Sequence, residues 1–85
     1  MTKYFIVAWF SLYLNGEHVK TDNIVNTAHE FNTMSECVMY TEGSKIALNV
    51  QVEKYLDYIH KDHDYTIDEI SCTDSETIKQ LSKNQ

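Results

Sequence analysis

The residue types that bind metal ions gather in one short segment of this chain. His60, Asp62, His63 and Asp64 lie within five consecutive positions, and two histidines three residues apart can share one face of a helix. Imidazole and carboxylate groups suit zinc and similar ions. A histidine near the end of a helix is also favoured by the helix dipole, without any metal. We therefore expect no metal site and no cofactor, and keep a small metal- or ligand-binding domain that uses His60 and His63 as an alternative.

The two cysteines, Cys37 and Cys72, are the candidate nucleophiles. A nucleophilic cysteine needs a base and an oxyanion-stabilising turn, and no motif in this sequence supplies either. We therefore expect no enzymatic activity. Two cysteines are too few for a disulfide-rich scaffold. We interpret them as reduced core residues, as is usual in a cytosolic protein, with a disulfide between them as the alternative.

The acidic residues are concentrated in the second half of the chain. Residues 53–76 contain eight of the 13 acidic residues, the net charge is −6, and all seven basic residues are lysine. This balance does not fit a protein that binds nucleic acid or an anionic membrane directly. The acidic surface serves either solubility or docking on a basic groove of another protein, where it would mimic nucleic acid. For the second case we assign six partner-binding carboxylates: Glu53, Asp57, Asp62, Asp64, Asp68 and Glu69.

Residues 4–14 are the segment around which the chain must fold. They hold the single tryptophan, and their β-branched and aromatic residues favour a strand. Side chains alternate along a strand, which places Phe5, Trp9 and Tyr13 on one face and a second apolar set on the other. Since a strand with one wet face should alternate in polarity, we predict a central strand. A second copy of the chain or a partner protein would cover Phe5, Trp9 and Tyr13; the C-terminal tail or a loop is the alternative cover.

The remaining elements follow from local signals. Asn15-Gly16 predicts a two-residue hairpin turn, and the second strand spans 17–20 and 24–31 with a bulge or turn between. Thr33 and Glu36 have the spacing of a capping box. Apolar residues then recur every three or four positions up to residue 59, which predicts a main helix over 45–60, with a shorter helix or a continuous extension before Gly43-Ser44. Residues 65–73 read as a final strand.

These elements predict an α+β fold. A β-β-α-β domain over residues 1–74 would place a three-stranded antiparallel sheet on one main helix, straight or kinked, and residues 75–85 would form a polar tail. The apolar N-terminal run is shorter than the roughly 20 residues that cross a membrane, and no signal-type cleavage site follows it. We therefore expect a cytoplasmic protein with no membrane contact.

A resemblance adds a functional expectation. The strand Tyr-Phe-Ile-Val-Ala-Trp-Phe at 4–10, the Asn15-Gly16 turn, Glu30-Phe31, and the placing of Cys37 and Cys72 resemble small bacteriophage-encoded accessory proteins. The resemblance implies a host-directed role in the host cytoplasm. We therefore expect a homodimeric accessory protein that binds and modulates or inhibits a host protein; a purely structural self-assembling protein is a further alternative.

Overall fold

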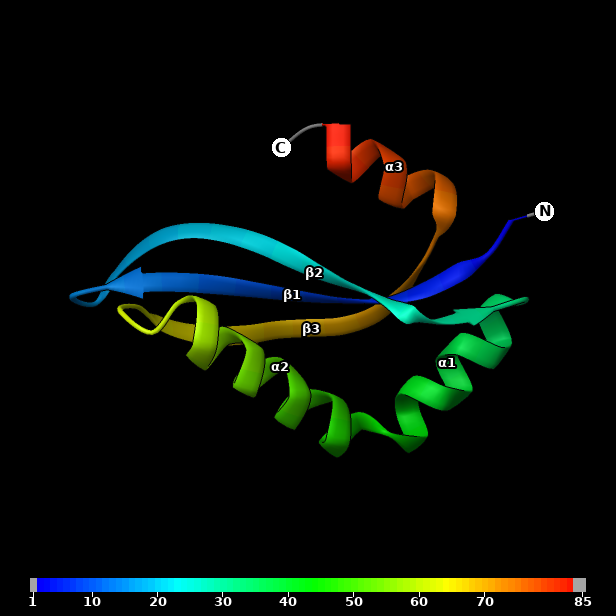
Figure 1. Cartoon of the computed structure of the whole chain (residues 1–85), viewed down its shortest axis with the longest axis horizontal. Helices are drawn as coiled ribbons and strands as arrows, with labels where there is room; N and C mark the ends of the chain where they lie inside the picture. The colour runs from blue at the N-terminus through cyan, green and yellow to red at the C-terminus, as the bar shows by residue number, and fades with distance from the viewer. Residues whose placement is uncertain (1, 84–85) are drawn as a thin grey trace.

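Strand β1 (Tyr4–Leu14) lies at the centre of a three-stranded antiparallel sheet with the order β2-β1-β3. The structure is a computed structural model that describes residues 2–83 (Figure 1). The other elements are, in chain order, β2 (Glu17–Phe31), α1 (Met34–Gly43), α2 (Lys45–Ile59), β3 (Asp64–Asp74) and α3 (Ser75–Lys83). The predicted α+β class, the antiparallel sheet and the central place of β1 are confirmed.

The hairpin between β1 and β2 has the predicted turn. Asn15 and Gly16 have φ values of 55° and 82°, the left-handed pair that a type I′ turn requires. The predicted interruption of the second strand at 21–23 is wrong, because β2 runs without a break through these residues. Its irregularities instead fall beside Leu12/Tyr13 and Tyr4/Ile6 of β1.

Helices α1 and α2 pack on one face of the sheet, below the strands in Figure 1. The core there has two clusters of buried residues, one around Ile6, Cys37 and Leu48 and one around Phe10, Leu12 and Leu56. The β1 residues in both clusters are even-numbered, as the strand period demands. The core therefore forms where alternate residues of β1 meet the two helices.

The helical region has the main helix close to its predicted bounds and the shorter helix before it, so the sheet packs on two helices where the fold prediction had one. Residues 34–59 form two helices that meet at Ser44, whose N–H donates to Tyr40 O at 2.9 Å and whose carbonyl accepts from Leu48 N at 2.9 Å. Thr33 caps α1 as predicted, since its Oγ1 accepts from Glu36 N at 3.1 Å. The division lets two short helices follow the twisted sheet, which a straight helix of that length would not do.

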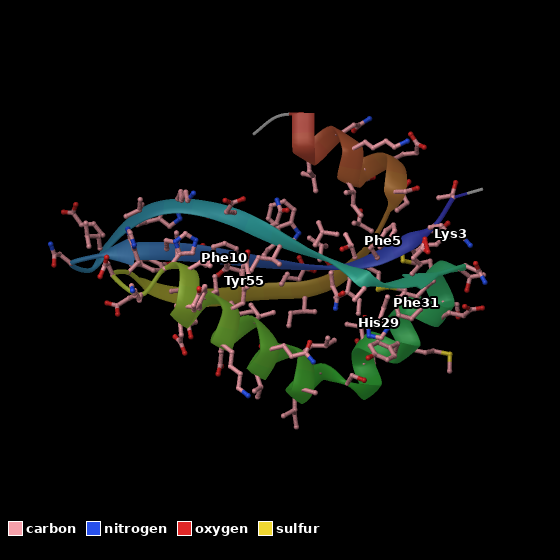
Figure 2. The ribbon with its side chains drawn as sticks, in the orientation of Figure 1. Lys3, Phe5, Phe10, His29, Phe31 and Tyr55 are labelled. Carbon is pink, nitrogen blue, oxygen red and sulfur yellow. A yellow bond between two sulfur atoms is a disulfide. The ribbon has the colours of Figure 1, made fainter. Side chains whose placement is uncertain are left out.

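The C-terminal segment forms a third helix. Figure 1 shows α3 on the side of the strands opposite α1 and α2, and Figure 2 shows Phe5 just beneath it. Ile78 and Leu81 of α3 are half-buried while most of its other described side chains are exposed. The second face of β1 is therefore covered at its Phe5 end by the tail, as the alternative had it. Residues 84 and 85 of the predicted tail lie outside the described residues.

A disulfide joins Cys37 of α1 to Cys72 of β3, with the two Cα atoms 6.2 Å apart. The interpretation of these cysteines as reduced is therefore wrong for this structure. The physical reason is their placing: Cys72 lies directly opposite Ile6 in the sheet, and Cys37, fully buried, packs on the same Ile6. The bond ties α1 to the sheet across a separation of 35 residues.

We expect reduction of this disulfide to destabilise the protein. Opening a loop of 35 residues restores conformational entropy to the unfolded chain, which corresponds to about 3–4 kcal/mol of unfolding free energy. Urea unfolding with and without dithiothreitol measures this difference. A Cys37→Ala/Cys72→Ala double variant is the control, because its unfolding should not respond to the reductant. Identical wild-type curves under both conditions would contradict the stabilising role.

Candidate functional site

The side of the sheet that faces away from α1 and α2 carries a group of polar side chains beside two aromatic residues of β1. Part of this side lies beneath α3. In the remaining part, β1 contributes Trp9, Ser11 and Tyr13, and their cross-strand partners on β2 and β3 point to the same side. We call this surface the outer face. Its residues are Trp9, Ser11 and Tyr13 of β1, His18, Thr21 and Asn23 of β2, and Asp64, Thr66, Asp68 and Glu69 of β3.

A chain of hydrogen bonds crosses the outer face from one edge strand to the other. Asp68 accepts from Thr66 Oγ1 at 2.9 Å through Oδ1 and from Ser11 Oγ at 2.6 Å through Oδ2. The Ser11 hydroxyl also lies 3.1 Å from Thr21 Oγ1, and Thr21 Oγ1 lies 3.0 Å from His18 Nε2. Each strand thus contributes at least one member. The network fixes these side chains relative to one another, because each is held by at least one neighbour.

A bulge in β3 makes this network possible. The pairing of β3 with β1 shifts between Trp9 and Phe10, so that Asp68 is an extra residue between the partners Glu69 and Ile67. A bulge turns the extra side chain toward a face it would not otherwise reach. Hydrogen bonds from Ser11 and then Thr66 stabilise the ionised carboxylate and lower the pKa of Asp68 below its usual value of 3.8. Asp68 is therefore anionic and oriented.

The network does not have the order of a nucleophile and its base. Ser11 is 6% exposed and donates its proton directly to the Asp68 carboxylate. His18 reaches Ser11 only through Thr21, whereas an activated serine bonds to the histidine and the carboxylate orients that histidine. The hydroxyl of Ser11 is therefore held by Asp68 and not by a histidine.

The structure brings together five of the nine predicted partner-binding residues. Trp9 lies directly opposite Glu69, and Tyr13 lies directly opposite Asp64, so each aromatic ring has a carboxylate as its cross-strand neighbour. Asp68 lies between these two pairs along the strand. The outer face therefore presents two half-buried aromatic residues beside three acidic ones.

The other four predicted residues lie elsewhere. Phe5 is at the end beneath α3 (Figure 2), and Asp62 is in the turn before β3. Glu53 and Asp57 belong to α2 on the opposite side of the sheet, where Asp57 Oδ1 accepts from Tyr65 Oη at 2.8 Å. This bond, followed by desolvation, raises the pKa of Tyr65 to about 12. The acidic surface that the sequence predicts as one is thus divided between two faces.

Sequence reasoning missed five members of the outer face, namely Asn23 and the four residues that are linked to Asp68 through hydrogen bonds. Ser11, His18, Thr21 and Thr66 form the hydrogen-bonded chain with Asp68. One signal in the sequence could have indicated this hydrogen-bonded chain. Ser11 lies between Trp9 and Tyr13 on one face of β1, and a polar residue on an apolar face needs a hydrogen-bond partner. The partner itself could not be found, because the bulge that supplies Asp68 leaves no mark in the periodicity.

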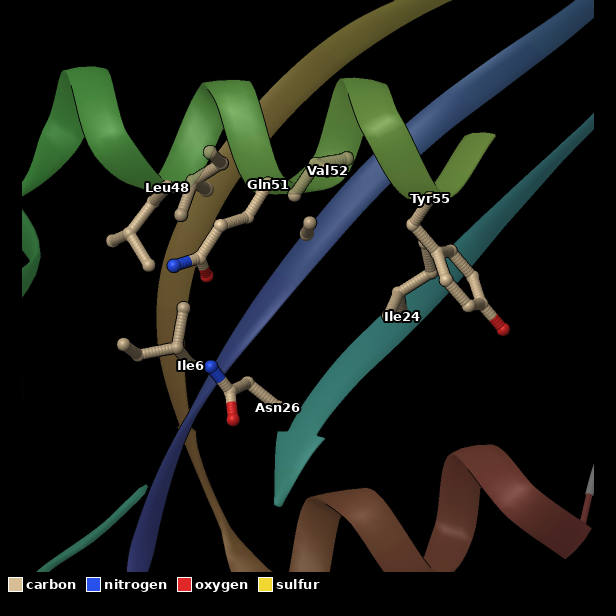
Figure 3. A pocket seen from close by; sticks show the side chains of 9 residues that line it. Ile6, Ile24, Asn26, Leu48, Gln51, Val52 and Tyr55 are labelled. Atoms are coloured by element: carbon tan, nitrogen blue, oxygen red, sulfur yellow. The ribbon is translucent and has the colours of Figure 1, made fainter. Parts of the chain in front are cut away.

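A second feature is an apolar groove between α2 and the sheet, with a volume of about 200 Å³. Figure 3 shows α2 above it and the three strands below. Its floor is formed by Ile6 and Ala8 of β1, and Tyr55 of α2 lies at its rim above Ile24 of β2. The groove is on the helical side of the sheet and is separate from the outer face.

The two histidines of the alternative metal-binding segment lie beside each other and near the core. The rings of His60 and His63 lie 6.1 Å apart, edge to face, and His60 also stacks near Phe10 at 5.9 Å. Within residues 2–83, no three histidine, cysteine or acidic side chains are placed to hold a metal ion. The structure therefore lends no support to the metal-binding alternative, and His60 is explained by its contact with the core.

We expect the contribution of Asp68 to stability to depend on pH. Folding favours its ionised form, so the stabilisation is present above about pH 4 and is lost as pH falls through the lowered pKa of the folded state. The difference in unfolding free energy between wild type and Asp68→Asn should therefore shrink between about pH 6 and pH 3. Urea unfolding at both pH values measures it, with Glu42→Gln, exposed on α1, as the control. A difference that stays constant would contradict the assigned role of Asp68.

Comparisons with known proteins leave the function to be argued from these residues. The chain matches no protein-family model, no curated protein and no solved structure. Among its described residues, no helix is long and apolar enough to span a membrane. The outer face and the groove are therefore the two features from which a function can be inferred.

Proposed function

We propose that this chain is a non-enzymatic protein-binding module whose outer face docks on a basic surface of a partner protein. One observation carries the proposal: Trp9 and Tyr13 lie opposite Glu69 and Asp64 across the β1–β3 pair. Aromatic residues supply much of the affinity at protein interfaces, and carboxylates beside them select a positive partner. The proposed binding surface is Trp9, Tyr13, Asp64, Asp68 and Glu69.

The chemistry of these pairs suits the cationic side chains of lysine and arginine. A cation can lie over an aromatic ring while it pairs with an adjacent carboxylate, and both interactions strengthen as water is excluded. Asp68 adds a third negative group, held between the pairs by Ser11 and Thr66. Since these groups are already positioned by the sheet, little conformational entropy is lost on binding.

In the part of the chain that the structure describes, no salt bridge joins a lysine to a carboxylate of the outer face. Lys20 Nζ instead pairs with Asp22 at 3.4 Å. The pairing of β2 puts Lys20 opposite Leu12 and Asp22 opposite Phe10, two residues that point to the helices. The outer face thus keeps its negative charge for a partner.

The biological setting of the proposal comes from the resemblance to phage-encoded accessory proteins. In that setting the partner is a host protein that the chain modulates or inhibits, and a nucleic-acid-binding groove is the kind of basic surface that the acidic face would fit. The setting is the host cytoplasm, where the Cys37–Cys72 disulfide would be an unusual feature, because reducing compartments disfavour such bonds.

We expect an arginine-rich peptide without aromatic residues to bind the outer face. Trp9 is the only tryptophan, so its fluorescence reports binding directly. An Asp64→Asn/Glu69→Gln double variant should bind roughly five- to tenfold more weakly, as loss of two exposed charge interactions implies. Binding by the wild type should also weaken between about 20 and 300 mM salt, because exposed charges are screened.

A Glu53→Gln/Asp62→Asn double variant is the matched control for this experiment. It also removes two negative charges, but from positions outside the outer face. It should bind the peptide as the wild type does, apart from a small long-range effect. Equal losses in both double variants would show that net charge alone drives binding. A neutral peptide of the same length that binds equally well would also overturn the proposal.

The predicted homodimer competes with a partner for the same face. Light scattering after size exclusion distinguishes them, on wild type and on Trp9→Asp. If a second copy covers the outer face, the wild type is a dimer and the variant a folded monomer, because a buried charge at Trp9 opposes association. A dimer that this variant disrupts would assign the outer face to self-association, as predicted for a homodimer, and would overturn docking of a heterologous partner on that face. A wild-type monomer would leave the outer face to a heterologous partner and remove self-association from the proposal.

A further inference from the structure

The groove beneath α2 arises from a gap in the core at Ala8. The two clusters of buried residues centre on Ile6 and on Phe10, and Ala8 is the β1 residue between them that faces the same side. It is 4% exposed and forms the floor of the groove. A larger residue at this position would join the two clusters. Alanine instead leaves an apolar hollow of about 200 Å³. The atoms that line such a hollow lack van der Waals contacts unless a ligand fills it.

The walls of the groove restrict what can fill it. None of its nine lining residues is charged, so an ionic ligand would lose its hydration without gaining a partner. The apolar walls come from all three strands and from α2. The residues are Ile6, Ala8, Ile24, Leu48, Val52, Tyr55 and Ile70. A neutral and mainly apolar ligand therefore fits the lining.

Two amide side chains give the groove a polar end. Figure 3 shows Gln51 of α2 and Asn26 of β2 reaching into the same space from opposite walls. Asn26 Oδ1 accepts from Ala28 N at 2.9 Å, which leaves its Nδ2 group to donate. The Gln51 amide makes no hydrogen bond to any residue in the described part of the chain. Together they can donate to, and accept from, a ligand with an amide-like edge.

The size of the groove sets the size of the ligand. An apolar protein cavity of about 150 Å³ holds one benzene molecule, so a hollow of about 200 Å³ accommodates a single ring with a small substituent. The Tyr55 ring at the rim is 48% exposed, so it can pack against the aromatic ring of the ligand. We propose that this groove binds a small neutral aromatic molecule bearing an amide-type group, with the ring over Ala8 and the amide between Asn26 and Gln51.

Benzamide is the probe that matches these features, with toluene lacking the amide and benzoate carrying a charge. Nitrogen–proton NMR spectra of the labelled chain follow the side-chain amides of Asn26 and Gln51 directly. We expect benzamide to shift both in a saturable way and benzoate to shift neither. The Ala8→Leu variant fills the floor and should bind benzamide at least about tenfold more weakly, since overpacking removes the space. Ala47→Leu, the same substitution at an exposed position of α2 outside the groove, should bind as the wild type does.

A second variant keeps the test decisive if Ala8→Leu fails to fold. Gln51→Leu retains the size of an exposed side chain but removes its amide. It should bind benzamide about fivefold more weakly, as loss of one hydrogen bond implies, with unchanged affinity for toluene. The proposal is overturned if benzamide gives no saturable shifts, or if folded Ala8→Leu binds it as wild type does. Equal affinity of the wild type for benzamide and toluene would exclude the role of the amides.

Discussion

The two apolar faces of β1 are the constraint on which the rest of the structure depends. A strand that must be buried on both sides has to be central, so the hairpin places β2 on one edge and the chain must return to place β3 on the other. The segment that connects β2 to β3 forms α1 and α2, and these helices cover the even-numbered residues of β1. The disulfide between Cys37 and Cys72 then ties that layer to the strand beside β1.

A chain of 85 residues has too little material to cover a sheet completely, since small domains bury a limited share of their surface. Both candidate sites arise from this shortage. On the helical side, two short helices and a small residue at Ala8 leave the groove open at β2. On the other side, α3 lies over the end of β1 that carries Phe5 (Figure 2). The hairpin half of that face is therefore left to Trp9, Tyr13 and the polar network.

The sequence predicts the elements that depend on local chemistry. The positive φ values at Asn15 and Gly16, the Thr33 cap and the central strand follow from turn preference, capping and hydrophobic period. The features that it cannot predict depend on pairing between distant residues. The bulge at Asp68 changes no hydrophobic period, and Cys37 and Cys72 meet only once the register of β1 and β3 is set. The acidic residues 53–76 appear as one group in sequence, although a helix and a strand carry them to opposite sides of the sheet.

This division of the acidic residues has a consequence for recognition. Glu53 and Asp57 stand by Tyr65 on the helical side, where the Tyr65 hydroxyl already donates to Asp57 and to the carbonyl of Glu53. The carboxylates of β3 share the outer face with Trp9 and Tyr13. The negative charge that lies beside these two rings is therefore confined to a narrow band along one strand pair. Charge further away is screened within roughly 10 Å at moderate salt. Under the proposed function, the partner's basic groups would therefore have to lie in a similarly narrow band.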